Sequence, residues 1–336
     1  MAERILASIR RISSIEPIAN ADRIETAKVG GWSVVVGKGD FSVGDEVVYF
    51  EIDSALPLSD VRFAFLEPRG SKVIDGINYH VLRTARLRGV YSQGLVLPVS
   101  HFEQDLALAE FSGTSLEEVL GVIKYEPPVP VNLSGEIAGQ FFAGVQKTDA
   151  ERVQNIDPET YHRLVTLHEW IPTLKLDGTS ATFVRDGDEL RVASRNWELR
   201  RSDENTHWQV ADQYDLENII PPGWVIQGEI YGPGIQKNRL KVNDLTLKVF
   251  RVTNNYGLDV PRDDWPTEIH ELAVPILDME LPATIDEAVE QVNGLKYGGV
   301  LAEGVVWHEA SGAIPYGLDR PCFKVVSNRY LAENGE

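Results

Sequence analysis

The sequence predicts two domains, a small β-barrel followed by an α+β domain built on antiparallel sheets. Three observations support this prediction: the length, one proline-rich segment, and a change of pattern across that segment. The chain has 336 residues, which is enough for two domains that each bury a core. Residues 125–135 (YEPPVPVNLSG) contain three prolines, which remove backbone donors and favour extended structure. We therefore expect a first domain at residues 1–125 and a second at residues 126–336.

Short β-rich runs fill the first domain, separated by turn sequences such as FSVGDE and VIDGIN. Closely spaced short strands with Gly/Asp turns are typical of a small barrel. The run GKGDFSVGDEVVYFEIDSALP suggests an OB-type barrel, although by pattern alone an SH3-like barrel fits about as well. A helix is expected in residues 115–125, because Ser115 and Glu118 have capping-box spacing and Gly121 follows as a stop. The expected strands are residues 32–39, 45–52, 78–87 and 93–99.

The second domain mixes helical and strand-like segments. The most regular helix signal is residues 285–292 (IDEAVEQV), opened by Thr284 with Glu287 three residues later and closed by Gly294. Such a mixture predicts an α+β domain on an antiparallel-rich sheet. Further helices are expected in residues 150–156, 158–167 and 213–220, and strands in residues 173–176, 179–186, 189–195, 224–232, 245–252, 302–309 and 322–328.

Composition excludes several classes of protein. The hydrophobic fraction of 43% and charged fraction of 25% are those of a globular protein. No apolar run approaches the ~18 to 20 residues that span a bilayer, and the charged N-terminus is not a secretory signal. We therefore expect a cytoplasmic protein without a membrane partner. The single cysteine, Cys322, excludes a disulfide framework and a multi-cysteine zinc site.

The charge distribution bears on a nucleic-acid partner. A net charge of −19 argues against one, because phosphate contacts need Lys and Arg. The basic residues are bunched, however, and three runs suggest a surface divided between acidic and basic faces; the alternative is that each run is a solvated face. These runs contain Arg83, Arg86 and Arg88; Arg195, Arg200 and Arg201; and Lys237, Arg239 and Lys241.

Five charged residues lie within strand-like segments of the second domain, namely Lys175, Asp177, Glu229, Glu303 and Lys324. Each of them has an ordinary alternative reading as a strand-end residue facing water. Isolated Lys and Glu side chains are seldom buried unless they are paired or functional. Each carboxylate also neighbours a glycine, which lets a ligand approach the backbone closely. Two lysines with three carboxylates are the composition of a metal-assisted phosphate site.

The segments that carry these residues occur in a recognisable order. KLDG, SRN, GEIYG, LKVF, EGVV and FKVV resemble the ordered motifs of the covalent nucleotidyltransferases: ATP-dependent DNA ligases, RNA ligases and mRNA capping enzymes. More narrowly, VGDEVVYFEIDSALP, LRTARLRGVYSQGLVLP, KTDAERVQN and FKVVSNRYL look like the Deinococcus-type nick-sealing RNA ligases, which place an OB module before the catalytic domain. The sequence ends soon after Lys324, which we expect leaves no room for the C-terminal OB domain of DNA ligases and capping enzymes.

The resemblance implies that Lys175 attacks the α-phosphorus of ATP and forms a lysyl–AMP intermediate. AMP then passes to a 5′-phosphate end, and the 3′-hydroxyl of an RNA strand displaces it to seal a nicked duplex. Mg²⁺ or Mn²⁺ would be held by Asp177, Glu229 and Glu303 through its waters; the alternative for one of these carboxylates is that it binds the ribose hydroxyls instead. Desolvation between Leu174 and Leu176, together with the metal, is expected to lower the pKa of Lys175.

Further site residues are implied by the same resemblance. Phe250 would stack on adenine, unless it is plain core, and Lys324 would offset charge on the α-phosphate. The chain departs from the family pattern at Leu174, where many ligases have glutamate, and at Val326, where related RNA ligases often have a second lysine. The remaining nucleotide contacts would be Lys147, Arg152, Gly178 and Arg195, and the contacts to nucleic acid would be Arg83, Arg86 and Arg88.

Two other functions stay open at this point. A capping-type guanylyltransferase shares the lysine chemistry but uses GTP. A non-catalytic nucleic-acid-binding protein would pair an OB barrel with a degenerate second domain, although the intact set of five charged residues argues against it. We expect the ligase, acting as a monomer.

Overall fold

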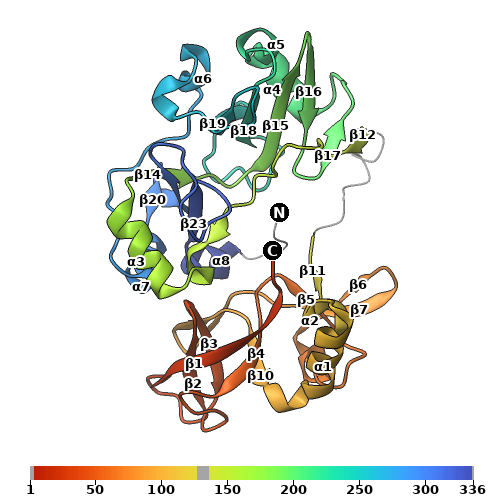
Figure 1. Ribbon diagram of the computed structural model, residues 1–336, viewed down its shortest axis with the longest axis vertical. Helices are drawn as coiled ribbons and strands as arrows, with labels where there is room; N and C mark the ends of the chain where they lie inside the picture. Colours follow the sequence, from red (N-terminus) through yellow and green to blue (C-terminus); the bar gives the residue numbers. More distant parts are fainter. Residues whose placement is uncertain (1–3, 127–135, 335–336) are drawn as a thin grey trace. The chain divides into compact units, whose positions relative to one another are not determined.

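The computed structural model describes residues 4–126 and 136–334, and these form two compact units (Figure 1). The first unit contains residues 4–126 together with 331–334, and the second contains residues 136–330. The sequence prediction placed residues 331–336 with the second domain instead. Most of the proline-rich segment lies outside the described residues. No helix in the described parts of the chain has the length and apolar character needed to cross a membrane.

The first unit is built mainly from antiparallel strands. Its helical segments are η1 (Ala64–Arg69), η2 (Val99–His101), α1 (Glu103–Ser112) and α2 (Leu116–Val119). Its strands are β1 (Ala7–Pro17), β2 (Ile24–Val29), β3 (Trp32–Gly37), β4 (Glu46–Phe50), β5 (Ser54–Pro57), β6 (Lys72–Ile74), β7 (Ile77–Val81), β8 (Ala85–Leu87), β9 (Val90–Ser92), β10 (Leu95–Pro98) and β11 (Ile123–Lys124).

A five-stranded sheet of order β10-β4-β1-β2-β3 forms the centre of this unit. The first half of β1 pairs with β4 and its second half pairs with β2, with a register shift between Ile12 and Ser14. Such an irregularity bends a strand, so one strand serves two partners and the sheet curls. In the sequence, β5 to β9 lie between β4 and β10. Strands β11, β5, β7 and β6, in that order, form a second sheet, and β8 and β9 form a hairpin.

The apolar run of β4 explains how this sheet is covered. Val47 and Tyr49 enter one buried cluster with Trp32, whereas Val48 and Phe50 enter another with Phe102. A strand buried on both faces has a continuous apolar run rather than an alternating one, and EVVYF is such a run.

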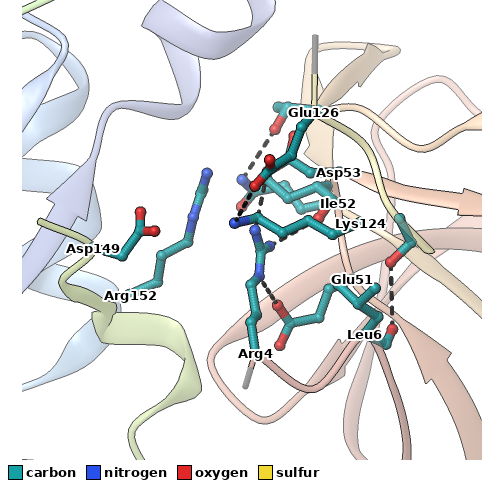
Figure 2. Close-up of polar contacts among 12 residues, drawn as sticks. Arg4, Leu6, Glu51, Ile52, Asp53, Lys124, Glu126, Asp149 and Arg152 are labelled. Carbon is teal, nitrogen blue, oxygen red and sulfur yellow. Dashed lines mark hydrogen bonds and ion pairs between the residues drawn. The ribbon is translucent and has the colours of Figure 1, made fainter. Parts of the chain in front are cut away.

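The N-terminal segment is fastened to the turn after β4, as Figure 2 shows. Arg4 Nε donates to Glu51 at 2.8 Å, one terminal nitrogen donates to the Ile52 carbonyl at 2.8 Å, and the other to Asp53 at 3.2 Å. Glu51 is only 3% exposed, so this fork of donors satisfies a buried carboxylate.

The second unit contains two larger sheets and a hairpin. Its helical segments are η4 (Val153–Asn155), α3 (Pro158–Leu167), α4 (Thr206–Gln213), α5 (Leu216–Ile219), η5 (Arg262–Asp264), α6 (Thr267–Glu271), α7 (Ile285–Asn293) and the start of α8 (Asn328–Asn334). Its strands are β12 (Ile137–Gln140), β13 (Glu151–Arg152), β14 (Trp170–Lys175), β15 (Thr179–Asp186), β16 (Glu189–Ala193), β17 (Trp197–Leu199), β18 (Val225–Tyr231), β19 (Thr246–Thr253), β20 (Lys296–Tyr297), β21 (Val300–Leu301), β22 (Gly304–Glu309) and β23 (Cys322–Val326).

The two sheets are each covered on one face by helices. The six-stranded sheet has the order β12-β17-β16-β15-β18-β19 and packs its apolar face against α4, α5 and α6. The four-stranded sheet has the order β13-β23-β22-β14 and packs against α3 and α7. All pairs are antiparallel except β13 with β23. The α+β class on antiparallel-rich sheets is therefore confirmed.

Several local predictions are confirmed and others are wrong. The capping box of Thr284 and Glu287 opens α7, and the strand expected at residues 179–186 is β15. Residues 150–156 are not a helix, because Glu151–Arg152 join the sheet as β13 and only one turn follows. The helix expected over residues 115–125 is limited to α2: Ser115 caps it through the Glu118 amide, Gly121 takes a φ of 64°, and Ile123–Lys124 form β11.

Candidate active site

A hollow in the second unit surrounds the end of β14. Its apolar wall includes Leu174, Leu176, Tyr231, Leu240, Tyr297 and Leu301. Its polar lining is Lys175, Asp177, Asn238, Arg239, Glu303 and Tyr330. An apolar pocket with a few convergent charged groups is the usual form of a small-molecule site.

Lys175 and Glu303 are brought together by strand pairing. Lys175, the last residue of β14, lies opposite Gly304 on β22, so Glu303 reaches the lysine directly. Lys175 Nζ donates to Glu303 Oε1 at 2.6 Å, and the two side chains are 25% and 17% exposed. A Cβ on Gly304 would lie 2.3 Å from the Val325 carbonyl, so glycine permits the close approach of β23 at this point.

Burial and the neighbouring carboxylates shift the pKa of Lys175 in opposite directions. Burial lowers the pKa of Lys175, as expected, but Glu303, Glu229 and Asp177 outweigh it and hold the pKa above its ordinary value. The expected net lowering therefore does not occur in the protein alone. The amine stays protonated until the charge of these carboxylates is offset.

Glu229 lies on the neighbouring sheet, and Gly178 lies in the bend between β14 and β15. Glu229 is on β18 opposite Ser180 of β15, and burial, partly countered by Lys175, raises its pKa to about 8. A Cβ on Gly178 would lie 2.3 Å from the Ile230 carbonyl and 3.0 Å from Glu229 Cγ. Glycine is thus required after Asp177 because β18 passes directly against the backbone.

Asp177 has two partners that the sequence analysis did not assign to the site. Its Oδ2 accepts a hydrogen bond from Arg239 Nε at 2.8 Å and another from the Tyr330 hydroxyl at 2.5 Å. Both partners line the hollow. The available signals were the basic run that contains Arg239 and the segment FKVVSNRYL that contains Tyr330.

Lys324 and Arg152 share a sheet face with Lys175. Arg152 pairs with Lys324, and Lys324 with Val306. Val306 pairs in turn with Thr173, two residues before Lys175. Paired residues and residues two apart point to the same side of a sheet, and the opposite side packs on α3 and α7. Neither cation is part of the lining of the hollow.

The segments KTD and SRN are held against each other. Lys147 Nζ donates to the Asn196 side chain at 2.8 Å, and Arg195 donates to Asp149 at 2.7 Å. Thr148 shares a hydrogen bond of 2.8 Å with Ser180, which pairs with Glu229. The structure thus brings Lys147 and Arg195 together beside the strand that carries Glu229.

Phe250 and Val326, which the sequence analysis also discussed, pack within the protein near the site. Phe250 packs against the cluster of Leu174 and Leu176 and is not part of the lining of the hollow. Val326 is 2% exposed opposite Gly304, so its position carries no second cation beside Lys175.

Arg83, Arg86 and Arg88 lie in the first unit, on or next to the β8–β9 hairpin. Arg83 lies over the Tyr125 ring at 5.8 Å and Arg86 over the Tyr91 ring at 5.6 Å, while Arg88 takes a turn conformation with a φ of 50°. Within residues 4–126 and 136–334, none of the three arginines pairs with a carboxylate.

The residues around Lys175 supply oxygen donors that suit a hard divalent cation. Among the described residues, no three His, Cys, Asp or Glu side chains are arranged to bind a metal directly. Asp177, Glu229 and Glu303 nevertheless act together on Lys175. Mg²⁺ usually keeps several of its waters, so this donor set fits an ion held through water rather than a dry cage.

Comparisons with known proteins assign a fold to the first part of the chain and a family to the second. An OB-fold domain model matches residues 6–99, which decides between the two barrel types, and an RNA ligase model matches residues 168–326. Naegleria gruberi RNA ligase with pyrophosphate is 35% identical, with 98% of each chain covered and a TM-score of 0.84. A mutant of that ligase with ATP and Mn is 34% identical, covering 97% of this chain and 98% of that chain, with a TM-score of 0.83. Curated proteins gave no match.

Proposed function

Because the chain belongs to the RNA ligase family, we propose that it is an ATP-dependent RNA ligase in which Lys175 carries AMP. The observation that carries this proposal is the position of Lys175. It lines a hollow at the end of a strand, and its Nζ lies 2.6 Å from Glu303 Oε1. ATP is the inferred substrate, since the similar Naegleria gruberi enzyme has structures with ATP and Mn and with AMP and Mn.

The first step is attack of the neutral Lys175 amine on the α-phosphorus of ATP. A phosphorus–nitrogen bond forms, the bond to the bridging oxygen breaks, and pyrophosphate leaves with the electron pair. In the second step a 5′-phosphate oxygen attacks the adenylate phosphorus, so that a phosphoanhydride bond forms, the phosphorus–nitrogen bond breaks, and the Lys175 amine leaves and takes up a proton. In the third step a 3′-hydroxyl attacks that 5′-phosphate, a phosphodiester forms, and AMP leaves.

The residues around Lys175 supply binding and charge. A divalent cation, Mg²⁺ or Mn²⁺, offsets phosphate charge when bound, and Asp177, Glu229 and Glu303 are the residues that would hold it through its waters. Lys324 and Arg152, on the same sheet face as Lys175, would offset charge on the phosphates. Phe250, which packs against the cluster of Leu174 and Leu176, would stack on the adenine base.

Lys147, with Arg152, would hold the outer phosphates of ATP, and Arg195 would contact the nucleotide or the phosphate of the nick. Lys147 donates a hydrogen bond to Asn196, and Arg195 donates one to Asp149. Gly178 serves by leaving room for the backbone of β18.

We further propose that the substrate is a nicked duplex with an RNA 3′-hydroxyl strand, sealed by a monomer, as in Deinococcus-type ligases. Arg83, Arg86 and Arg88 would contact the duplex. Arg86 and Arg88 are exposed and Arg83 is half-buried, and cations without carboxylate partners suit phosphate binding.

The test is incubation of the protein with α-labelled ATP or GTP and Mg²⁺ or Mn²⁺, followed by a denaturing gel. We expect covalent label from ATP and not from GTP. Label from GTP alone would identify a capping-type enzyme. If neither nucleotide gave label, the protein would be a non-catalytic nucleic-acid-binding protein. Duplexes with one nick and an RNA or DNA 3′-hydroxyl strand then test sealing, and sealing only of single strands would overturn the nick assignment.

A further inference from the structure

One oxygen of the Asp177 carboxylate is held from two sides. Oδ2 accepts from Arg239 Nε at 2.8 Å and from the Tyr330 hydroxyl at 2.5 Å, and the guanidinium carbon lies 5.3 Å from the centre of the Tyr330 ring. All three side chains line the hollow of Lys175. Within the described parts of the chain, Asp177 Oδ1 accepts no hydrogen bond.

Arg239 is fixed by its own loop. It lies between β18 and β19, where Asn238 has a φ of 41°. The Asn238 side chain both accepts from the Val242 amide at 3.2 Å and donates to the Val242 carbonyl at 2.9 Å. Gln236 donates to the Gly178 carbonyl at 3.3 Å, which ties this loop to the residue after Asp177.

Tyr330 is equally constrained. Its side chain is 6% exposed, and its amide donates to Ser327 Oγ at 3.1 Å. The neighbouring Asn328 amide donates to the Asn293 side chain at 2.8 Å, at the end of α7. Two donors on rigid supports therefore converge on one oxygen, an arrangement that orients a carboxylate rather than merely neutralising it.

We propose that Arg239 and Tyr330 are positioning residues, which fix Oδ2 of Asp177 so that Oδ1 is presented to a water of the nucleotide-bound divalent cation. This inference rests on the proposed function. The geometry favours it because the two donors use one oxygen only and leave the other as an acceptor within the hollow. The ring of Tyr330 also keeps the Arg239 guanidinium in place by a cation–π contact.

The effect of losing either donor follows from this arrangement. Tyr330→Phe removes a single oxygen atom, and Arg239→Lys keeps the charge but loses the planar Nε donor. Outer partners of metal-binding groups typically change metal affinity or activity by about 10- to 100-fold. For each variant we expect about a 10-fold higher Mn²⁺ concentration at half-maximal lysyl–AMP formation, with the maximal rate recovered at high Mn²⁺.

The experiment measures Mn²⁺ in two ways on the full chain with ATP. One is the titration of lysyl–AMP formation, and the other is the loss of the free Mn²⁺ paramagnetic resonance signal, which needs no turnover. Asp177→Asn provides the decisive background: Tyr330→Phe should add no further weakening there, because residues that act through one another are not additive. Matched controls are Arg163→Lys, in an exposed pair on α3, and Tyr256→Phe, on an exposed turn. Both should behave as the parent protein.

Each result decides the matter. Unchanged Mn²⁺ dependence in Tyr330→Phe and Arg239→Lys overturns the inference, as does an undiminished effect of Tyr330→Phe in the Asp177→Asn background. A loss of maximal rate that Mn²⁺ does not restore also overturns it. Failure of the proposed function is distinguishable, because the parent protein would then form no lysyl–AMP at any Mn²⁺ concentration.

Discussion

Replacing Lys175 separates its chemical role from its role in balancing charge. Lys175→Arg keeps a cation beside Glu303 but cannot supply a neutral amine, because guanidinium stays protonated. Lys175→Met removes both. Lys175 Nζ lies 2.6 Å from Glu303 Oε1, and the two side chains are 25% and 17% exposed. An exposed ion pair contributes less than about 1 kcal/mol to stability, whereas disrupting a buried pair costs about 3–5 kcal/mol. The burial of this pair is intermediate, so we expect an intermediate energy.

We therefore expect Lys175→Met to destabilise the second unit by about 2 kcal/mol, since Glu303 would be left without its partner. For a unit of this size that corresponds to a Tm lower by about 4–8 °C. Lys175→Arg should change the stability by less than about 1 kcal/mol. Both variants should lose lysyl–AMP formation completely.

Thermal unfolding monitored by fluorescence and gel analysis with α-labelled ATP measure the two effects. Lys38→Met, at an exposed residue of the first unit, controls for the loss of a lysine as such and should retain labelling and Tm. A labelled Lys175→Arg protein would refute the nucleophile. A Lys175→Met protein as stable as Lys175→Arg would refute the role of the ion pair.

Three other outcomes are expected. Glu229→Ala and Glu303→Ala should each slow lysyl–AMP formation by about 10- to 100-fold and recover at high Mn²⁺; full activity of both at low Mn²⁺ would contradict the metal role. In a salt series, replacing Arg86 and Arg88 by Ala should weaken nick binding and lower the slope of log affinity against log salt by about one per arginine, whereas lysyl–AMP formation should change little. Burial, reinforced by nearby arginine, lowers the pKa of His308 to about 4, so stability should be lost as pH falls from about 6.5 towards 4. His308→Gln should remove that part of the loss in urea unfolding, and an unchanged pH profile would contradict it.

Sequence-local signals predicted the strands of the site well. The chain alternates apolar and charged residues around Lys175 and Lys324, and β14 and β23 form where this pattern predicted strands. Gly178 is required because β18 lies 2.3 Å from where its Cβ would be. That requirement is visible in the sequence only as a glycine after an aspartate, and its reason lies in a strand about 50 residues away.

Long-range placement could not be predicted. Glu151–Arg152 join β23 as a parallel pair, an interaction that overrides the helical pattern of residues 150–156. Arg239 meets Asp177 across 62 residues and Tyr330 meets it across 153. No sequence periodicity connects such distant positions, so the two hydrogen bonds that hold Asp177 could be identified only from the structure.

Charge explains why the carboxylates surround the nucleophile. In the protein alone, the Lys175 ammonium partly compensates Glu303, Glu229 and Asp177, and these in turn hold its pKa high. Attachment of AMP converts the ammonium into a neutral nitrogen and adds a negatively charged phosphate. Glu303 and Asp177 then lose their cation just as another anion arrives, while Glu229, with its pKa of about 8, carries little of the negative charge at neutral pH. At this separation and burial, such repulsion is too large to leave uncompensated. The lysyl–AMP form must therefore recruit positive charge that the free form does not need, from Lys324, Arg152 and a divalent cation. The carboxylates thus keep the amine protonated in the free protein and favour cation binding once AMP is attached.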